Sequence, residues 1–172
     1  MQISLISDNH SYDGADVLEH LHESDEIWHA GDIGSLASLQ QIKAIAPVKA
    51  VYGNIDDTDV RLEYPLNLQW ECEGLKIFMT HIGGYPGRYK ERVRKLLEEI
   101  KPDIYICGHS HICKVVKDKK LDLLHMNPGA YGHHGFHKMR TMLKFEITNG
   151  ELSNLRVVEL GYRGVTNKNF KM

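Results

Sequence analysis

Short apolar runs alternate with segments of helical periodicity along the first two thirds of the chain. Four runs rich in β-branched, leucine or aromatic side chains are typical of buried parallel strands: residues 3–6, 26–30, 48–52 and 104–107. Three segments repeat apolar side chains at a helical period: residues 15–22, 36–45 and 92–100. This alternation predicts an α/β fold in which helices connect parallel strands.

A different pattern follows residue 65. Residues 66–70 alternate apolar and polar side chains, and a Glu-Gly turn at 73–74 leads into the apolar run 75–79, which together predict a hairpin. Further strands are expected at 112–116 and 121–125 and in a hairpin around the Asn-Gly pair at 149–150. The second half of the chain should therefore be mostly β structure.

Composition narrows the class of protein. The 172 residues are 42% hydrophobic and 26% charged, which is ordinary for a globular protein, and we expect one domain over residues 1–172. A net charge of -2 lacks the basic excess that binds a phosphate backbone, so nucleic acid is an unlikely partner. No apolar run approaches the roughly 20 residues that span a bilayer, and three irregularly spaced cysteines fit reduced thiols, so we expect a cytoplasmic protein.

Candidate chemistry lies where the predicted strands end. The first strand is followed by Asp8 and His10, the second by Gly31 and Asp32, and the third by Gly53 and Asn54. Open α/β sheets carry their functional groups at the carboxyl ends of parallel strands, so these side chains should share one edge of one sheet. Taken singly, each has an ordinary alternative, namely a helix cap for either aspartate and a turn residue for Asn54.

Histidines follow two later strands. The chain has eleven histidines, and imidazole is a common ligand of transition metals at neutral pH. His81 follows the strand at 75–79, and the sequence Gly-His-Ser-His places His109 and His111 directly after the strand at 104–107. Three more histidines, at 133, 134 and 137, lie in a glycine-rich loop that either lines a pocket or is exposed.

Together these groups suffice for two divalent ions that share one carboxylate. A bridged pair of ions roughly 3.5 to 4 Å apart holds a hydroxide and contacts both the attacking and the leaving oxygens of a phosphoryl group. Nitrogen and oxygen ligands without thiolate suit manganese, iron, nickel or zinc better than calcium. The predicted chemistry is hydrolysis of a phosphate ester. The candidate ligands are Asp8, His10, Asp32, Asn54, His81, His109 and His111.

The ordered motifs Asp8-Asn9-His10, Gly31-Asp32, Gly53-Asn54, Thr80-His81 and Gly108-His109-Ser110-His111 resemble the metal-binding set of the calcineurin-like metallophosphoesterases, in particular the small single-domain phosphodiesterases of bacteria and archaea. The resemblance spans residues 3 to about 130. It implies a four-layer α/β/β/α sandwich. It also implies that Asp8, His10, Asp32 and His111 hold one ion, and Asp32, Asn54, His81 and His109 the other.

We therefore expect a two-metal phosphodiesterase for a small or nucleotide-like substrate, with manganese as the first choice of metal. Asp32, Asn54, His109 and Asp56 are the expected catalytic residues. Many relatives follow Gly-Asn with a histidine that protonates the leaving group, whereas this chain has Ile55. The acid would then be Asp56 or a histidine of the 133–137 loop, unless the metals act alone on good leaving groups.

Three other interpretations remain open from the sequence. The chain could be a phosphomonoesterase, or a protein-binding scaffold that retains the fold, as one retromer subunit of the superfamily does. The metals could also be structural, in which case chelation should unfold the protein. The sequence leaves the oligomeric state open, including a homo-oligomer.

Overall fold

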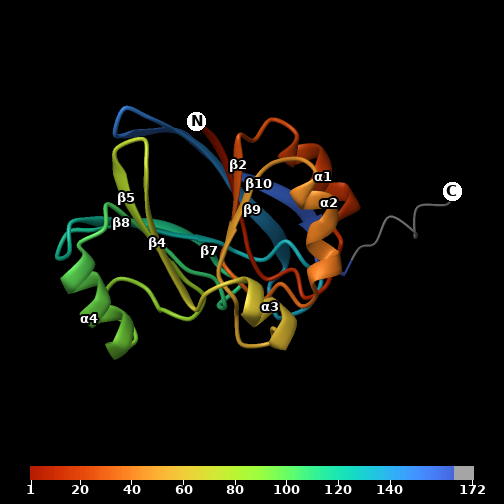
Figure 1. Ribbon diagram of the computed structural model, residues 1–172, viewed down its shortest axis with the longest axis horizontal. Helices are drawn as coiled ribbons and strands as arrows, with labels where there is room; N and C mark the ends of the chain where they lie inside the picture. Colours follow the sequence, from red (N-terminus) through yellow and green to blue (C-terminus); the bar gives the residue numbers. More distant parts are fainter. Residues whose placement is uncertain (165–172) are drawn as a thin grey trace, which may run out of the picture.

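The computed structural model, which describes residues 1–164, is built around two five-stranded mixed sheets that pack against each other (Figure 1). The first sheet has the strand order β10-β9-β1-β2-β3 and the second has the order β4-β5-β6-β8-β7. The strands are β1 (Gln2–Ile6), β2 (Glu26–His29), β3 (Val48–Ala50), β4 (Asn67–Cys72), β5 (Leu75–Thr80), β6 (Ile104–Ile106), β7 (Cys113–Asp118), β8 (Leu123–Pro128), β9 (Met139–Thr148) and β10 (Glu151–Tyr162).

The first sheet joins the beginning of the chain to its end. β1 and β2 are parallel, as are β2 and β3, which confirms the predicted parallel strands. On its other side β1 pairs antiparallel with β9, and β9 continues into β10 through the turn at 149–150. The predicted last hairpin therefore completes the sheet that begins at residue 2.

The second sheet is formed by the middle of the chain. β4 and β5 make the predicted antiparallel hairpin, and β5, β6 and β8 then run parallel to one another. β7 lies at the edge, antiparallel to β8. β7 and β8 each begin one to two residues later than the sequence suggested, at Cys113 and Leu123.

Helices cover the outer faces of both sheets (Figure 1). On the first sheet, α1 (Ala15–Leu21), the 3-10 turn η1 (Leu36–Leu39) and α2 (Gln40–Lys43) bury Val17, Leu21, Leu39 and Ile42 against strand residues such as Ile27. On the second sheet, α4 (Glu91–Ile100) buries Val93 and Leu97 against Phe78 and Tyr105. Alternate strand residues, among them Trp28, Ile77 and Phe145, fill the space between the sheets. This arrangement confirms the four-layer α/β/β/α sandwich.

Two local features differ from expectation. The helix expected over 36–45 is split into η1 and α2, where a glutamine pair follows the 3-10 turn. The short helix α3 (Thr58–Glu63) was not predicted, because six residues with one buried side chain, Val60, give little periodicity. Asp57 caps it by accepting a hydrogen bond from the amide of Val60 at 3.1 Å.

Within residues 1–164, every helix is too short or too polar to span a bilayer. Residues 165–172, which include the end of the expected domain, lie outside the described residues.

Candidate metal centre

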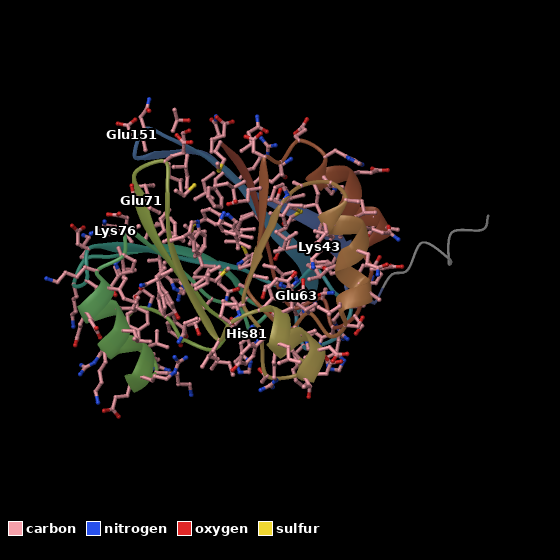
Figure 2. All side chains as sticks on the ribbon, viewed as in Figure 1. Lys43, Glu63, Glu71, Lys76, His81 and Glu151 are labelled. Atoms are coloured by element: carbon pink, nitrogen blue, oxygen red, sulfur yellow. The ribbon has the colours of Figure 1, made fainter. Side chains whose placement is uncertain are left out.

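The carboxyl ends of strands from both sheets meet at one end of the sandwich. Asp8 follows β1, Asp32 lies just beyond β2, His81 follows β5, and His109 and His111 follow β6. His81 lies at the lower end of the strands in Figure 2. Residues separated by up to about a hundred positions in sequence thus come together, as the strand-end pattern predicted.

One group of ligand atoms comprises Asp8, His10 and His111, which lie within 4.8 Å of one another. His111 Nε2 is 3.1 Å from Asp8 Oδ1 and 3.4 Å from His10 Nε2. Asp8 is fully buried, whereas both imidazoles are partly exposed. Their nitrogens converge on a buried carboxylate, which is an arrangement suited to a divalent cation.

A second group comprises Asp32, His81 and His109, again within 4.8 Å. His81 Nδ1 lies 2.7 Å from the carbonyl oxygen of Ala30, so Nδ1 carries the proton and donates it there. The other nitrogen, Nε2, lies 3.2 Å from Asp32 Oδ1, yet it is buried and makes no hydrogen bond within the described residues. In the neutral imidazole this Nε2 carries a lone pair, and together with the Asp32 carboxylate it offers two ligand atoms to a metal ion. The ligand atoms of Asp32, His81 and His109 are therefore suited to binding a metal ion.

The two groups are contiguous. His10 of the first group lies 3.7 Å from Asp32 Oδ2, and His81 of the second lies 3.9 Å from Asp8 Oδ1. Asp32 is thus reached by histidines from both groups. These two groups are consistent with two divalent ions.

Hydrogen bonds from the surrounding chain orient the two carboxylates. Ser7 Oγ donates to Asp8 Oδ2 at 2.6 Å, and the amide of His109 lies 3.1 Å from the same oxygen. The amide of Ile55 donates to Asp32 Oδ1 at 3.1 Å. Donors of this kind fix the direction of a carboxylate before any ligand arrives.

The loop after β8 brings two further histidines to the first group. His137 Nδ1 lies 3.2 Å from His111 Nδ1, and the ring of His134 lies 4.7 Å from that of His10. His133 instead packs edge-on against Tyr12, with ring centroids 4.7 Å apart. The sequence left open whether this loop lines a pocket or is exposed. The positions of His134 and His137 next to the candidate site fit the first alternative.

The backbone at the site is unusual. Asp8, His10, Asp32, His109 and His111 all have positive φ, between 49° and 67°. Residues other than glycine rarely adopt this left-handed region, and each costs about 1 kcal/mol or more. Five of the seven candidate ligands thus sit in strained loops that turn directly after a strand, which is typical of a functional site.

Two glycines allow the strand-end loops to approach each other. A Cβ atom on Gly53 would lie 2.1 Å from Asp32 Oδ1, and one on Gly108 would lie 2.8 Å from Asp8 Oδ2. Any side chain at either position would displace a candidate ligand. The small residues that precede Asn54 and His109 are therefore needed for close packing of the site.

Asn54 and Asp56 lie in the loop after β3. Asn54 is exposed and lines the same pocket as His81. Asp56 is 4% exposed, and its two oxygens accept the backbone amides of Gly34 and Gly53, each at 2.6 Å. These contacts fix the loop that carries Asn54. Proton donation by Asp56, one of the alternatives that the sequence left open, stays a prediction.

Burial and charge set the protonation of the histidines. Burial lowers the pKa of His10 more than the carboxylates of Asp32 and Asp8 raise it. Burial and the neighbouring His81 lower the pKa of His109. Burial also opposes the charged form of His81, but Asp32 and Asp8 outweigh it and leave the pKa of His81 raised. Burial would raise the pKa of Asp32, yet its contact with His81 holds that pKa below the ordinary value.

These features define a class, the α/β/β/α proteins with clustered metal ligands at the strand ends. Comparison with known families agrees, because residues 1–150 match the calcineurin-like phosphoesterase superfamily domain. The chain belongs to this family. It is 31% identical over 135 residues to a probable metallophosphoesterase from Methanothermobacter thermautotrophicus, covering 76% of this chain and 77% of the relative. It is 34% identical over 136 residues to one from Methanocaldococcus jannaschii, covering 76% and 68%.

Solved structures share the fold. A single mutant of Vps29 from Entamoeba histolytica has a TM-score of 0.74 at 16% identity, covering 92% of this chain and 99% of that one. Wild-type Vps29 from the same organism, complexed with Zn²⁺, has a TM-score of 0.71 at 17% identity, covering 94% and 100%. A structure described as a novel archaeal phosphodiesterase has a TM-score of 0.67 at 20% identity, covering 92% and 99%.

Proposed function

We propose that this protein is a dinuclear metal-dependent phosphodiesterase that hydrolyses a small or nucleotide-like phosphodiester. The observation that carries the proposal is the buried, unpartnered Nε2 of His81 facing Asp32, within a set of six ligand residues in two adjoining groups. An archaeal phosphodiesterase of the same fold supports the choice of a diester.

We assign one ion to Asp8, His10, Asp32 and His111, and the other to Asp32, Asn54, His81 and His109. Such a pair supplies Lewis-acid polarisation of the phosphoryl oxygens and an acidified water at neutral pH. Two dications outweigh the two carboxylates of Asp8 and Asp32, so the occupied site attracts an anionic ester. Manganese is our first choice of metal, while the zinc held by a Vps29 structure makes zinc the next to test.

The exposed side of the site is where the substrate enters. Asn54 and His109 are exposed, whereas Asp8, Asp32 and His81 are buried. Asn54 and His109 are therefore the ligand residues placed to touch the ester itself. Ile55, next to Asn54, is 43% exposed and donates no proton, so the enzyme should favour esters with acidic leaving groups.

We further propose a single domain over residues 1–172, acting in the cytoplasm. The three cysteines, Cys72, Cys107 and Cys113, are all free thiols, which fits a reducing compartment. The sandwich over residues 1–164 has continuous cores on both sides of each sheet.

Purified protein loaded with Mn²⁺ should hydrolyse bis(p-nitrophenyl) phosphate faster than p-nitrophenyl phosphate. Asp32→Asn should lose nearly all of this turnover, while Asp122→Asn, at an exposed turn that carries none of the candidate ligands, should retain it. A faster rate with the monoester would instead identify a phosphomonoesterase. Absence of metal-dependent turnover of both esters would refute an enzyme.

The second candidate is a protein-binding scaffold with an intact metal site. It is favoured by the structural likeness to Vps29. An Asp32→Asn protein that loses metal and yet supports the function of the chain in cells would favour this candidate over catalysis.

A further inference from the structure

A pocket of about 300 Å³ opens beside the second ligand group. His81 and Asn54 line one part of it, and Arg61 and Arg92 line another. Because His81 belongs to both the pocket and the ligand group, a substrate held by the metals would extend one of its ends into this pocket. The two arginines come from different halves of the sandwich, α3 and α4.

Arg61 is held by neutral groups. Its Nε donates to the carbonyl oxygen of Asp56 at 2.7 Å, and its Nη2 donates to that of Asn54 at 3.2 Å. The guanidinium also lies over the ring of Tyr52, 4.8 Å from the centroid. These contacts fix the orientation of the guanidinium, and within residues 1–164 they leave its positive charge without an anionic partner.

Arg92 is also held by hydrogen bonds to neutral groups. Its Nη1 donates to Asn67 Oδ1 at 3.0 Å, and its Nη2 donates to Thr80 Oγ1 at 3.3 Å. Both acceptors are neutral oxygens at the ends of β4 and β5.

Some other arginines of residues 1–164 have a carboxylate partner, whereas Arg61 and Arg92 have none there. Arg140 pairs with Asp16 at 2.7 Å and Arg94 lies 3.7 Å from Glu98, whereas no acidic side chain of residues 1–164 lies within 4.0 Å of the guanidinium nitrogens of Arg61 or Arg92. Two oriented guanidiniums with uncompensated charge form a site for an anion with several oxygens, since each presents N–H groups in a planar fork.

We propose that this pocket is an anion subsite that binds a second phosphate group of the substrate. The inference rests on the proposed function and makes it more specific: the substrate is a phosphodiester with a terminal phosphate on one ester arm. Tyr52, Leu66 and Ile82 also line the pocket and offer apolar surface to the atoms that connect the two phosphates. A dianionic phosphate matches two guanidiniums better than a carboxylate with one charge does.

The test compares two chromogenic diesters that differ only at the arm. One is p-nitrophenyl ethyl phosphate, and the other carries a terminal phosphonate on the ethyl group. The Mn²⁺-loaded protein should show a kcat/KM for the phosphonate ester that exceeds that of the plain ester by roughly tenfold or more. In Arg92→Gln the ratio of the two kcat/KM values should fall roughly three- to tenfold, and in Arg92→Lys by less, because the charge remains.

Arg94→Gln is the matched control. Arg94 lies on the same helix, two residues away, and faces Glu98 instead of the pocket, so the ratio should keep its wild-type value. Arg61→Gln should lower the ratio as Arg92→Gln does. Raising the ionic strength should reduce the wild-type preference, because the arginines are exposed and their attraction is screened.

Binding of the phosphonate ester, measured by calorimetry in the wild type and the arginine variants, separates the two proposals. Turnover of both esters with equal kcat/KM, or an unchanged ratio in both arginine variants, would refute the subsite and leave the phosphodiesterase standing. Failure to hydrolyse either ester would refute the phosphodiesterase, and the subsite would then stand only if Arg61→Gln and Arg92→Gln weaken binding of the phosphonate ester.

Discussion

His111 and His137 face each other through their Nδ1 atoms, 3.2 Å apart. His137 Nε2 lies 3.1 Å from the carbonyl oxygen of Gly132, which accepts only, so Nε2 carries the proton of His137. Its Nδ1 is then an acceptor, and His111 must donate from Nδ1. This chain of hydrogen bonds leaves His111 Nε2 as a bare lone pair directed at Asp8, which is the tautomer that binds a metal.

Replacing His137 should therefore weaken metal binding at the first ligand group without removing a ligand. Outer hydrogen bonds of this kind change metal affinity roughly 10- to 100-fold. We expect His137→Phe to raise the Kd of the ion at Asp8, His10 and His111 by about tenfold or more, as measured by metal titration and elemental analysis. His137→Gln should retain much of the affinity, because its amide oxygen accepts the same hydrogen bond.

The control is His22→Phe, at the exposed end of α1, which should leave metal affinity unchanged. Equal affinity in wild type and His137→Phe would mean that His111 is oriented by its own backbone instead.

Much of the site could be predicted because its ligands follow strands directly. The position of Asp8 or His109 in three dimensions depends on a short apolar run and the residues just after it, and both are visible in sequence. The pairing of His137 with His111 depends instead on the path of a glycine-rich loop, and the meeting of Arg61 with Arg92 depends on how the two halves pack. Neither leaves a local pattern, because both relationships are tertiary contacts.

The same distinction holds for the fold. The parallel strands and the hairpin turn at 149–150 have strong local signals, whereas α3 has one buried residue, Val60, and a cap at Asp57. The place of β9 beside β1 follows from core packing between Leu143, Phe145 and residues over a hundred positions away. The residues alone do not predict long-range pairing of this kind.

Metal binding should stabilise the protein without being needed for folding. The cores between and outside the sheets do not include the ligand histidines. At a free metal concentration of 100 times Kd, one bound ion adds about 2.7 kcal/mol. For a protein of this size that corresponds to a rise in Tm of roughly 5 to 10 °C.

Thermal unfolding followed by circular dichroism, with and without a chelator, measures this rise. The chelated protein should keep its native spectrum and a cooperative transition, and Asp32→Asn should lose most of the gain on adding Mn²⁺. Complete loss of the native spectrum on chelation would show that the metals are structural.

The left-handed backbone of His109 should cost stability that a glycine recovers. At φ 67°, alanine is disfavoured relative to glycine by about 1 kcal/mol. In the metal-free protein, His109→Gly should therefore have a Tm roughly 2 to 4 °C above that of His109→Ala. The same pair of substitutions at Glu19, exposed within α1, should give the opposite order, since glycine is the poorer helix former. Equal Tm values for the two variants at position 109 would show that the strain is relieved by movement of the loop.

Stability should fall in acid because His125 is buried on β8 as a neutral imidazole. It is 1% exposed, and burial, helped by the charge of Lys114, lowers its pKa to about 4. The ordinary value is 6.5, so the unfolded chain takes up a proton that the folded protein resists. Above pH 6.5 the neutral His125 has no effect on the free energy of unfolding. As the pH falls from 6.5 toward 4, the free energy of unfolding decreases by up to about 3 kcal/mol.

Urea unfolding at pH 7, 6 and 5 measures the free energy of unfolding directly. In His125→Phe, which keeps an aromatic ring against Tyr105, the decline with falling pH should be shallower than in the wild type by as much as about 1.4 kcal/mol per pH unit below pH 6. His22→Phe should decline as the wild type does, because that imidazole is exposed to solvent in the folded protein. If His125→Phe follows the wild-type decline, then the acid sensitivity belongs to other buried histidines, of which His29, with its pKa lowered to about 3 by burial, is the next to test.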